Sequence, residues 1–183
     1  MTPAMELGAF VAPDMLPALP EIVIGCGAMT LLLFGVFSKN SSRTVTLGAL
    51  LVMALSAVLV LAQPGERVEA FGGMFVVSEF TRFVKLLILL GSGVSLVMAR
   101  GYVKRERMNR FEFPVLVVLA TLGMMMMVSA NDLIALYMGL ELQSLALYVI
   151  AAIKRDSQRS TEAGLKYFVL GALASGMLLY GAS

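Results

Sequence analysis

Residues 131–153 of the chain read NDLIALYMGLELQSLALYVIAAI. From Asp132 to Ile153 this stretch has 22 residues, almost all apolar, which is long enough to cross the ~30 Å hydrocarbon core of a bilayer. One carboxylate, Glu141, lies near its middle. A charged side chain at that depth costs about 2.5–3.5 kcal/mol on insertion scales, so Glu141 is expected to face the protein interior or water. The stretch predicts a transmembrane helix with a functional carboxylate at its centre.

Three further polar side chains share the helix face of Glu141. Tyr137, Ser144 and Tyr148 are separated from it by four, three and seven residues, which places all of them on one side of a helix. A polar stripe of this kind can hold water and pass protons along a membrane helix. The alternative interpretation is that the serine and tyrosines only bind neighbouring helices together. For a carboxylate in the middle of the membrane, a functional role is favoured.

The composition is that of an integral membrane protein. Of 183 residues, 59% are hydrophobic and 14% are charged, whereas soluble domains are about 45–50% apolar and about 25% charged. There is no histidine and a single cysteine, Cys26, which excludes imidazole ligation and an intrachain disulfide. Neither a GxGxxG nor a P-loop pattern is present. We therefore expect no cofactor in this chain, and no nucleic acid as a partner.

The apolar segments predict an all-α polytopic membrane protein with one membrane domain over residues 1–183. The first 19 residues contain three prolines and predict a short extended arm that leads into the membrane. Six membrane spans follow, over about 20–37, 44–62, 79–99, 113–130, 132–153 and 164–182.

Two local patterns predict how the last three spans pack. Only Ala130 and Asn131 separate the fourth span from Asp132, a plausible N-cap, so the fourth and fifth spans should form a tight antiparallel hairpin. In the sixth span, small residues recur at four-residue spacing on two adjoining faces, 171 with 175 and 172 with 176. This spacing predicts close packing against another helix.

Charged residues also stand inside or beside the first and third spans. The third span carries Glu79, Arg82 and Lys85 in its first two turns. Long side chains that extend to the interface account for Glu79 and Arg82. Lys85 lies about two turns deep, so it is a candidate for an inward-facing charge. Glu21, at the start of the first span, is assigned to the positive end of that helix dipole.

The basic residues between the spans are distributed very unequally. Loops 38–43, 100–112 and 154–163 fall on one side of the membrane, and the opposite side holds Arg67 alone outside the spans. The basic side carries Lys39, Arg43, Arg100, Lys104, Arg105, Arg107, Arg110, Lys154, Arg155 and Arg159. By the positive-inside rule these loops are cytoplasmic and the N-terminus is outside. For a bacterial cytoplasmic (inner) membrane the N-terminus would be periplasmic.

Several motifs resemble the antiporter-like membrane subunits of proton-pumping NADH:quinone oxidoreductase, or respiratory complex I. They are NDLI at 131–134, GLELQSL at 139–145, EAGLKYFVLG at 162–171 and FTRFVK at 80–85. The sequence GLELQSL is most similar to that of subunit N, because subunits L and M typically have an aromatic residue before the glutamate. The resemblance covers roughly residues 79–183, and the first two spans are too generic to contribute.

The resemblance implies a fold of about fourteen helices, built from two inverted repeats that each contain a broken helix. The chain would then be the N-terminal part of such a protein, truncated at its C-terminus. Glu141 is implied to be the key membrane carboxylate and Lys166 a second functional position. The family pairs that glutamate with a lysine on the following, seventh, helix, which lies beyond this sequence.

Lys166 is not expected to be the direct partner of Glu141. With the predicted spans, Glu141 lies about 18 Å from the cytoplasmic end of its helix, whereas Lys166 lies only two residues inside its own. The two side chains should therefore differ by roughly 15 Å in depth. Lys166 is expected at the cytoplasmic mouth of a hydrated route, or as an anchor at the interface.

The function implied by the resemblance is that of a non-redox subunit of a proton-translocating enzyme complex. NAD, FMN, iron–sulfur clusters and quinone would be held by partner subunits, and the neighbours would be other antiporter-like and small membrane subunits in the lipid bilayer. Two alternatives remain: a subunit of an Mrp-type cation/proton antiporter, and a passive membrane scaffold in which Glu141 is structural.

Overall fold

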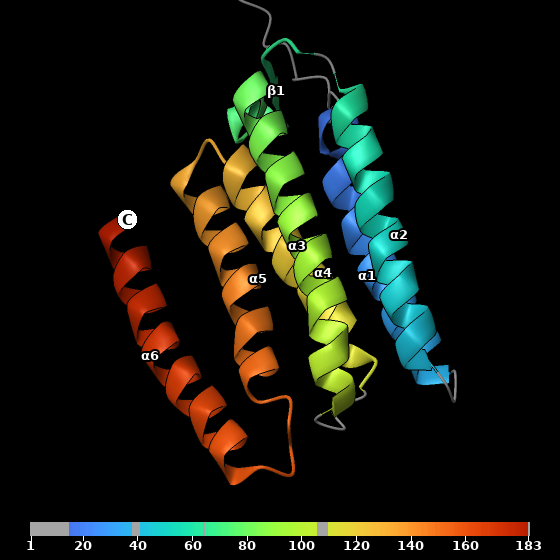
Figure 1. Ribbon diagram of the computed structural model, residues 1–183. Helices are drawn as coiled ribbons and strands as arrows, with labels where there is room; N and C mark the ends of the chain where they lie inside the picture. Colours follow the sequence, from blue (N-terminus) through green and yellow to red (C-terminus); the bar gives the residue numbers. More distant parts are fainter. Residues whose placement is uncertain (1–14, 38–40, 64, 106–109, 183) are drawn as a thin grey trace, which may run out of the picture.

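The chain folds into a bundle of long helices that run side by side (Figure 1). The computed structural model describes residues 15–37, 41–63, 65–105 and 110–182. Within these residues the helices are α1 (Leu19–Phe37), α2 (Ser41–Ala62), α3 (Glu79–Arg105), α4 (Glu112–Ser129), α5 (Leu133–Ala151) and α6 (Gln158–Ala182). All six are long and apolar enough to cross a membrane. The predicted all-α polytopic fold is confirmed.

Helix α4 occupies the centre of the bundle, in contact with α1, α2, α3 and α5. The buried apolar core lies among the first four helices and includes Ile24, Val45, Leu96 and Val118. Helix α6 packs mainly against α5 and forms the outer edge of the bundle, with the C-terminus at its end (Figure 1). The first four helices therefore make a packed unit, to which α5 and α6 are added on one side.

The predicted hairpin of α4 and α5 is present and unusually close. Asp132 caps α5, because its side chain accepts hydrogen bonds from the backbone N–H groups of Ile134 and Ala135 at 3.0 and 3.4 Å. A Cβ atom at Gly123 would lie 2.6 Å from the backbone nitrogen of Gln143. The two glycines of this contact, Gly123 and Gly139, let the helix backbones touch directly.

Helix α6 packs through one of the two small-residue faces that the sequence predicted. Gly171 lies under the hydroxyl group of Tyr148, where any side chain would collide, and Ser175 is buried against α5. Ala172 is exposed, and a Cβ at Gly176 would meet no atom within 4 Å. The face with residues 171 and 175 holds α5, and the face with residues 172 and 176 is open.

A short hairpin follows α2 where the sequence predicted only a loop. Strand β1 (Val68–Ala70) pairs antiparallel with β2 (Phe75–Val77), and a 3₁₀ turn joins them. Gly72 and Gly73 have φ angles of 67° and 89°, which glycine adopts without steric cost. The amide group of Asn131 donates to the carbonyl oxygen of Gly73 at 2.8 Å, so the hairpin is attached to the α4–α5 turn. Strands of three residues are too short to show an alternating pattern.

Two helices extend beyond the apolar segments that located them. Helix α3 runs to Arg105 rather than to about 99, and α6 begins at Gln158 rather than at about 164. Both extensions are rich in polar and charged residues, and hydropathy detects only the part of a helix that is apolar enough to lie in lipid. At the start of the chain, residues 1–14 of the expected arm lie outside the described residues, and Leu16–Ala18 forms a 3₁₀ turn.

Candidate functional site

Glu141 lies between α5 and α6 in a group of three hydrogen-bonding side chains. The Ser175 hydroxyl group, on α6, lies 2.6 Å from Oε2 of Glu141 and 3.1 Å from the hydroxyl oxygen of Tyr137. Ser175 is buried, whereas Glu141 and Tyr137 are half-buried. The sequence placed Tyr137 and Glu141 one helical turn apart on one face, and α6 covers that face with Ser175.

The hydrogen atoms in this group have one consistent arrangement when Glu141 is ionised. A carboxylate only accepts hydrogen bonds, and a serine hydroxyl group has one hydrogen to donate. Ser175 must then donate to Glu141, and the Tyr137 hydroxyl group donates to Ser175. If Glu141 takes up a proton, its O–H can donate to Ser175, which in turn donates to Tyr137. Rotation of the hydroxyl groups reverses the direction of the chain without moving either helix.

The other two members of the predicted polar stripe lie apart from this chain. Tyr148 is buried in an aromatic group on α6, with its ring 4.8 Å from that of Tyr167 and 5.7 Å from that of Phe168. Among the described residues, Ser144 makes no hydrogen bond to the group around Glu141. Tyr137 is therefore linked to Glu141 through Ser175, whereas Tyr148 lies about 10 Å from Glu141 along α5.

Lys166 is not in contact with Glu141. It is exposed on α6, and its Nζ lies 2.5 Å from Oε1 of Glu162, one turn earlier on the same helix. Ser175 marks the level of Glu141 on α6 and is nine residues from Lys166, which corresponds to about 13 Å along the helix. This separation is close to the difference in depth expected from the sequence, although α6 begins earlier than predicted.

A second charged group, which sequence reasoning did not assemble, lies inside the first four helices. Nζ of Lys85 on α3 is 2.6 Å from Oε1 of Glu21 on α1, and the two side chains are 0% and 7% exposed. The Lys85 ammonium group also lies 5.0 Å from the centre of the Phe75 ring. Glu21 does lie in the first turn of α1, as the sequence predicted, and the structure adds Lys85 as its partner.

The signal that could have identified this pair was depth. Helices α1 and α3 both begin at the same end of the bundle, and Glu21 and Lys85 each lie within the first two turns. Opposite charges at similar depth on two membrane helices are candidates for pairing, because each is costly alone. Ser175 offered a weaker signal, since a serine in a small-residue face is usually explained by packing.

Arg82 has a structural role beyond extension to the interface. Its Nε and Nη2 donate to the carbonyl oxygens of Val60 and Leu61 at 3.3 and 3.0 Å. These are among the last carbonyl groups of α2, which have no partner within their own helix. Arg82 thus caps α2 from α3.

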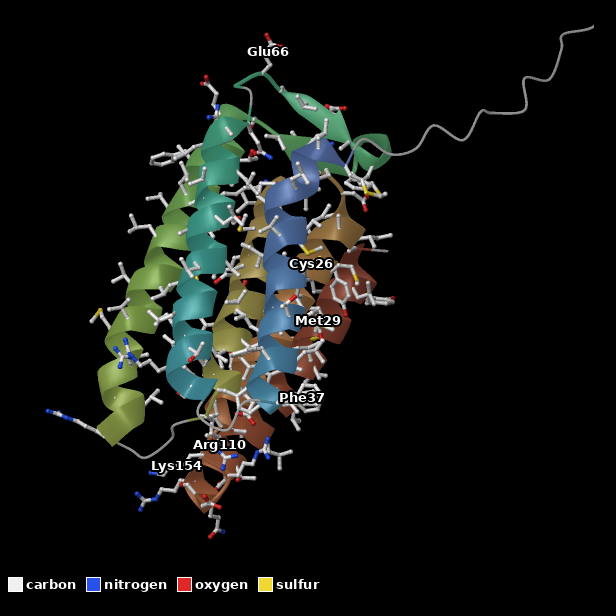
Figure 2. All side chains as sticks on the ribbon, turned by 90° about the vertical axis from the view of Figure 1, so that its right-hand side faces the viewer. Cys26, Met29, Phe37, Glu66, Arg110 and Lys154 are labelled. Atoms are coloured by element: carbon white, nitrogen blue, oxygen red, sulfur yellow. The ribbon has the colours of Figure 1, made fainter. Side chains whose placement is uncertain are left out.

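The positions of the charged loops agree with the asymmetry seen in the sequence. Figure 2 shows Glu66 at one end of the bundle, and Arg110 and Lys154 at the other. Two of the ten basic residues, Lys39 and Arg107, lie outside the described residues. Within the described part of the chain, no group of three or more His, Cys, Asp or Glu side chains is placed to bind a metal ion.

Comparison with known proteins gives consistent matches. Residues 130–183 match the family described as NADH:quinone oxidoreductase/Mrp antiporter, TM. The chain is 62% identical over 180 residues to NADH-quinone oxidoreductase subunit N of Parvibaculum lavamentivorans, covering 98% of this chain and 37% of that protein. It is 56% identical over 172 residues to subunit N of Paramagnetospirillum magneticum, covering 93% of this chain and 35% of that protein.

A solved structure agrees with these relatives. A chain of respiratory complex I from Thermus thermophilus with bound aureothin superposes with a TM-score of 0.73 and 33% identity, over 88% of this chain and 35% of that chain. The similarity includes the first two helices, which carry no distinctive motif. The chain spans slightly more than a third of the length of these relatives.

Proposed function

We propose that the chain, which is similar to part of subunit N of bacterial NADH-quinone oxidoreductase, forms part of the proton-translocating path of such a subunit. Its helices would lie in a bacterial inner membrane, beside other antiporter-like and small membrane subunits. NAD, FMN, iron–sulfur clusters and quinone would be bound by partner subunits.

The observation that carries this proposal is the hydrogen-bonded group of Glu141, Ser175 and Tyr137 between α5 and α6. A membrane carboxylate that only held helices together would need no second hydroxyl group behind its partner. Here the carboxylate, the serine and the tyrosine form a continuous chain that can run in either direction. Such a chain can pass a proton when each oxygen gives its hydrogen to the next one and takes up another from behind, after which rotation of the hydroxyl groups restores the original direction.

The driving force would come from a change in the charge near Glu141. Burial disfavours the ionised form of a carboxyl group, and a nearby cation favours it. The resemblance implies that this cation is a lysine on the next helix along the full-length protein. Moving one proton against 100 mV costs about 2.3 kcal/mol, and a change of one pKa unit corresponds to about 1.36 kcal/mol. Moving a lysine toward or away from a carboxyl group can shift the pKa of that group enough to offset this cost.

Lys166 would act at a distance from this exchange. It lies about 13 Å from the level of Glu141 and is paired with Glu162, nearer the end of the bundle with the basic loops. We place Lys166 at the mouth of the proton route on that side. With the basic loops in the cytoplasm, this would be the side from which protons are taken up.

The test is the Glu141→Gln variant of the full-length subunit within the assembled complex. Glutamine keeps the shape and hydrogen-bonding capacity of the side chain and removes its titrating proton. We expect assembly to survive, and the rate of proton uptake, with the NADH oxidation coupled to it, to fall at least about tenfold, because the loss of a proton-transferring group typically costs more than that in rate. Lys166→Ala should have a milder effect, since water can partly replace an interfacial lysine.

Glu79→Gln is the matched control, because Glu79 is an exposed carboxylate at the start of α3. Normal pumping by Glu141→Gln vesicles, matched for complex content, would favour the scaffold interpretation. The name of the matched family also includes Mrp antiporters. Co-purification of the full-length protein with flavin and iron–sulfur proteins is expected only for the NADH-quinone oxidoreductase.

A further inference from the structure

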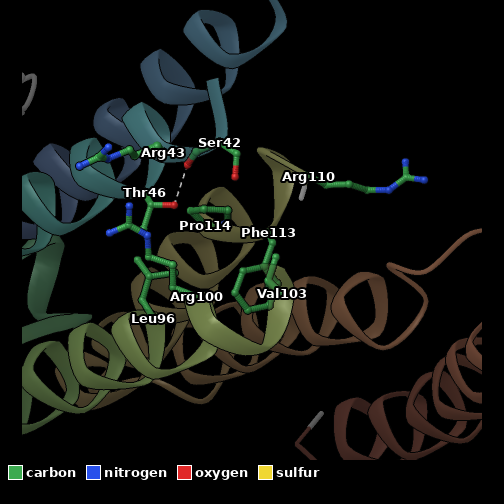
Figure 3. A pocket seen from close by; sticks show the side chains of 9 residues that line it. All are labelled: Ser42, Arg43, Thr46, Leu96, Arg100, Val103, Arg110, Phe113 and Pro114. Carbon is green, nitrogen blue, oxygen red and sulfur yellow. Dashed lines mark hydrogen bonds between the residues drawn. The ribbon is translucent and has the colours of Figure 1, made fainter. Parts of the chain in front are cut away.

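A cavity of about 270 Å³ lies at the basic end of the bundle, among the ends of α2, α3 and α4. Its walls include three arginines: Arg43 from the first turn of α2, Arg100 from the last turns of α3, and Arg110, which precedes α4. Figure 3 shows these three around the cavity, with the Arg100 side chain turned toward Thr46 and those of Arg43 and Arg110 extending outward on opposite sides.

Among the residues that the structure describes, no acidic side chain compensates the charge of this cavity, because neither aspartate nor glutamate lines it. Among the described residues, none of the three arginines takes part in an ion pair. Arg100 is turned toward Thr46 in the cavity wall, and the long side chains of Arg43 and Arg110 lie at the rim, so this arrangement is suited to bind an anion. Arginine is also the side chain best suited to bind phosphate oxygens, because its planar group donates two parallel hydrogen bonds.

Apart from Ser42 and Thr46, the remainder of the lining is apolar, which restricts the kind of anion. Leu96 and Pro114 are buried in its wall, and Phe113 and Val103 are half-buried there. The Thr46 hydroxyl group donates to the carbonyl oxygen of Ser42 at 2.7 Å, and its oxygen retains capacity to accept. A charged rim over an apolar wall, at the end of a membrane helix bundle, matches a molecule with a phosphate head and hydrocarbon chains.

We propose that this cavity binds the phosphate group of an anionic membrane lipid. Basic pockets between transmembrane helices on the cytoplasmic side are a recurrent form of such sites. Arg100 would meet the phosphate inside the cavity, and the long, outward side chains of Arg43 and Arg110 would turn inward over it. The acyl chains would leave along the apolar wall near Leu96. A bound lipid would thereby join the ends of these three helices.

The experiment uses the assembled complex that contains the full-length subunit, in nanodiscs of phosphatidylcholine. A photoreactive phosphatidylglycerol, with the reactive group near the head of one acyl chain, is added at subsaturating amount, and its crosslinks are mapped by mass spectrometry. We expect crosslinks on residues 96–103 and 113–119. Unlabelled phosphatidylglycerol should compete for them, and excess inorganic phosphate should not.

The variant that tests the arginines is Arg43→Gln/Arg100→Gln. Each arginine near the membrane surface contributes roughly a fivefold gain in affinity, so crosslinking at these residues should fall by about 25-fold. Arg105→Gln/Arg159→Gln is the matched control, because it removes two exposed basic residues from the same end of the bundle without touching the cavity. Its crosslinking should stay within about twofold of the wild type.

Three results would overturn the proposal. Equal labelling by a photoreactive phosphatidylcholine would show that the cavity does not select for anionic lipid. Competition by inorganic phosphate as effective as that by phosphatidylglycerol would show a site for a soluble anion instead. Unchanged crosslinking in Arg43→Gln/Arg100→Gln would exclude these arginines. The first two comparisons use the wild-type complex, so they decide the matter even if the variant fails to assemble.

Discussion

The ammonium group of Lys85 on α3 lies 2.6 Å from the carboxylate of Glu21 on α1, and the bundle almost completely excludes solvent from both. The two helices are separated in the sequence by α2 and the β1–β2 hairpin. Phe75 of that hairpin contacts the same ammonium group with its ring. One ion pair thus joins three parts of the chain at one end of the bundle, and each charge depends on the other for compensation in an apolar setting.

Removing one member of this pair should be far more damaging than removing both. Lys85→Met leaves the Glu21 carboxylate buried without a partner, which typically costs about 3–5 kcal/mol. Glu21→Gln/Lys85→Met removes the charge from both sides and should recover most of that loss. The measurement is the amount of assembled complex in membranes and its thermal stability. Lys166→Met is the control, since that lysine is exposed and should tolerate the change. If the single and double variants were equally unstable, the pair would not be what stabilises this end of the bundle.

The serine that joins Tyr137 to Glu141 provides a second prediction. Ser175→Ala breaks the hydrogen-bonded chain, and a hydrogen bond to a charged group contributes about 1.5–3 kcal/mol. If that contribution is lost from the proton-transfer step, its rate should fall about tenfold or more. The measurement is the rate of proton uptake, in vesicles matched for complex content, when NADH oxidation is started.

Ser144→Ala is the matched control for this experiment, because Ser144 lies on α5 near Glu141 but outside the hydrogen-bonded group. It should leave the rate of pumping nearly unchanged. Ser175→Thr keeps the hydroxyl group and should retain more activity than Ser175→Ala. Equal losses in the two alanine variants would indicate a general packing effect and count against the chain through Ser175.

The close contact of α4 with α5 gives a prediction about assembly. A Cβ atom at Gly123 would lie 2.6 Å from the backbone nitrogen of Gln143, and backbone atoms cannot move aside as a flexible side chain can. Gly123→Val should therefore separate the helices, at a cost of at least about 1–3 kcal/mol, and lower the yield of assembled complex. Gly91→Ala is the control, because a Cβ at Gly91 would meet no atom within 4 Å. A normal yield from Gly123→Val would contradict the direct backbone contact.

The sequence was sufficient for the helices and for the position of Glu141, but not for its partners. Apolar length and charge placement determine where a membrane helix lies, so the spans and the basic end could be predicted. Helical periodicity placed Tyr137, Ser144 and Tyr148 on one face, but periodicity does not say which of them a neighbouring helix will contact. Only the packing of α6 through Gly171 brings Ser175 to Glu141 and leaves Ser144 aside.

The pairing of Glu21 with Lys85 likewise could not be predicted from the sequence. Each residue near a helix end had an adequate local explanation, a helix dipole for Glu21 and an inward-facing charge of unknown partner for Lys85. The pairing depends on how α1 and α3 sit against α4, and the spacing along one chain contains no information on this arrangement. Arg82 is similar, because the carbonyl groups that it caps belong to another helix.

The basic end of the bundle predicts its orientation in the membrane. Glu66 lies at one end of the bundle and Arg110 and Lys154 at the other (Figure 2). Glu66 is exposed, and so is Asp156, two residues after Lys154. By the positive-inside rule we expect the end with Arg110 and Lys154 to face the cytoplasm. In a full-length subunit without other cysteines and with Cys26→Ala, an impermeant thiol reagent should label Glu66→Cys in intact cells. Asp156→Cys should react only after the membrane is permeabilised, which also controls for its accessibility. Labelling of Asp156→Cys from outside, with Glu66→Cys protected, would contradict this orientation. It would also place the mouth of the proton route, near Lys166, on the opposite side of the membrane.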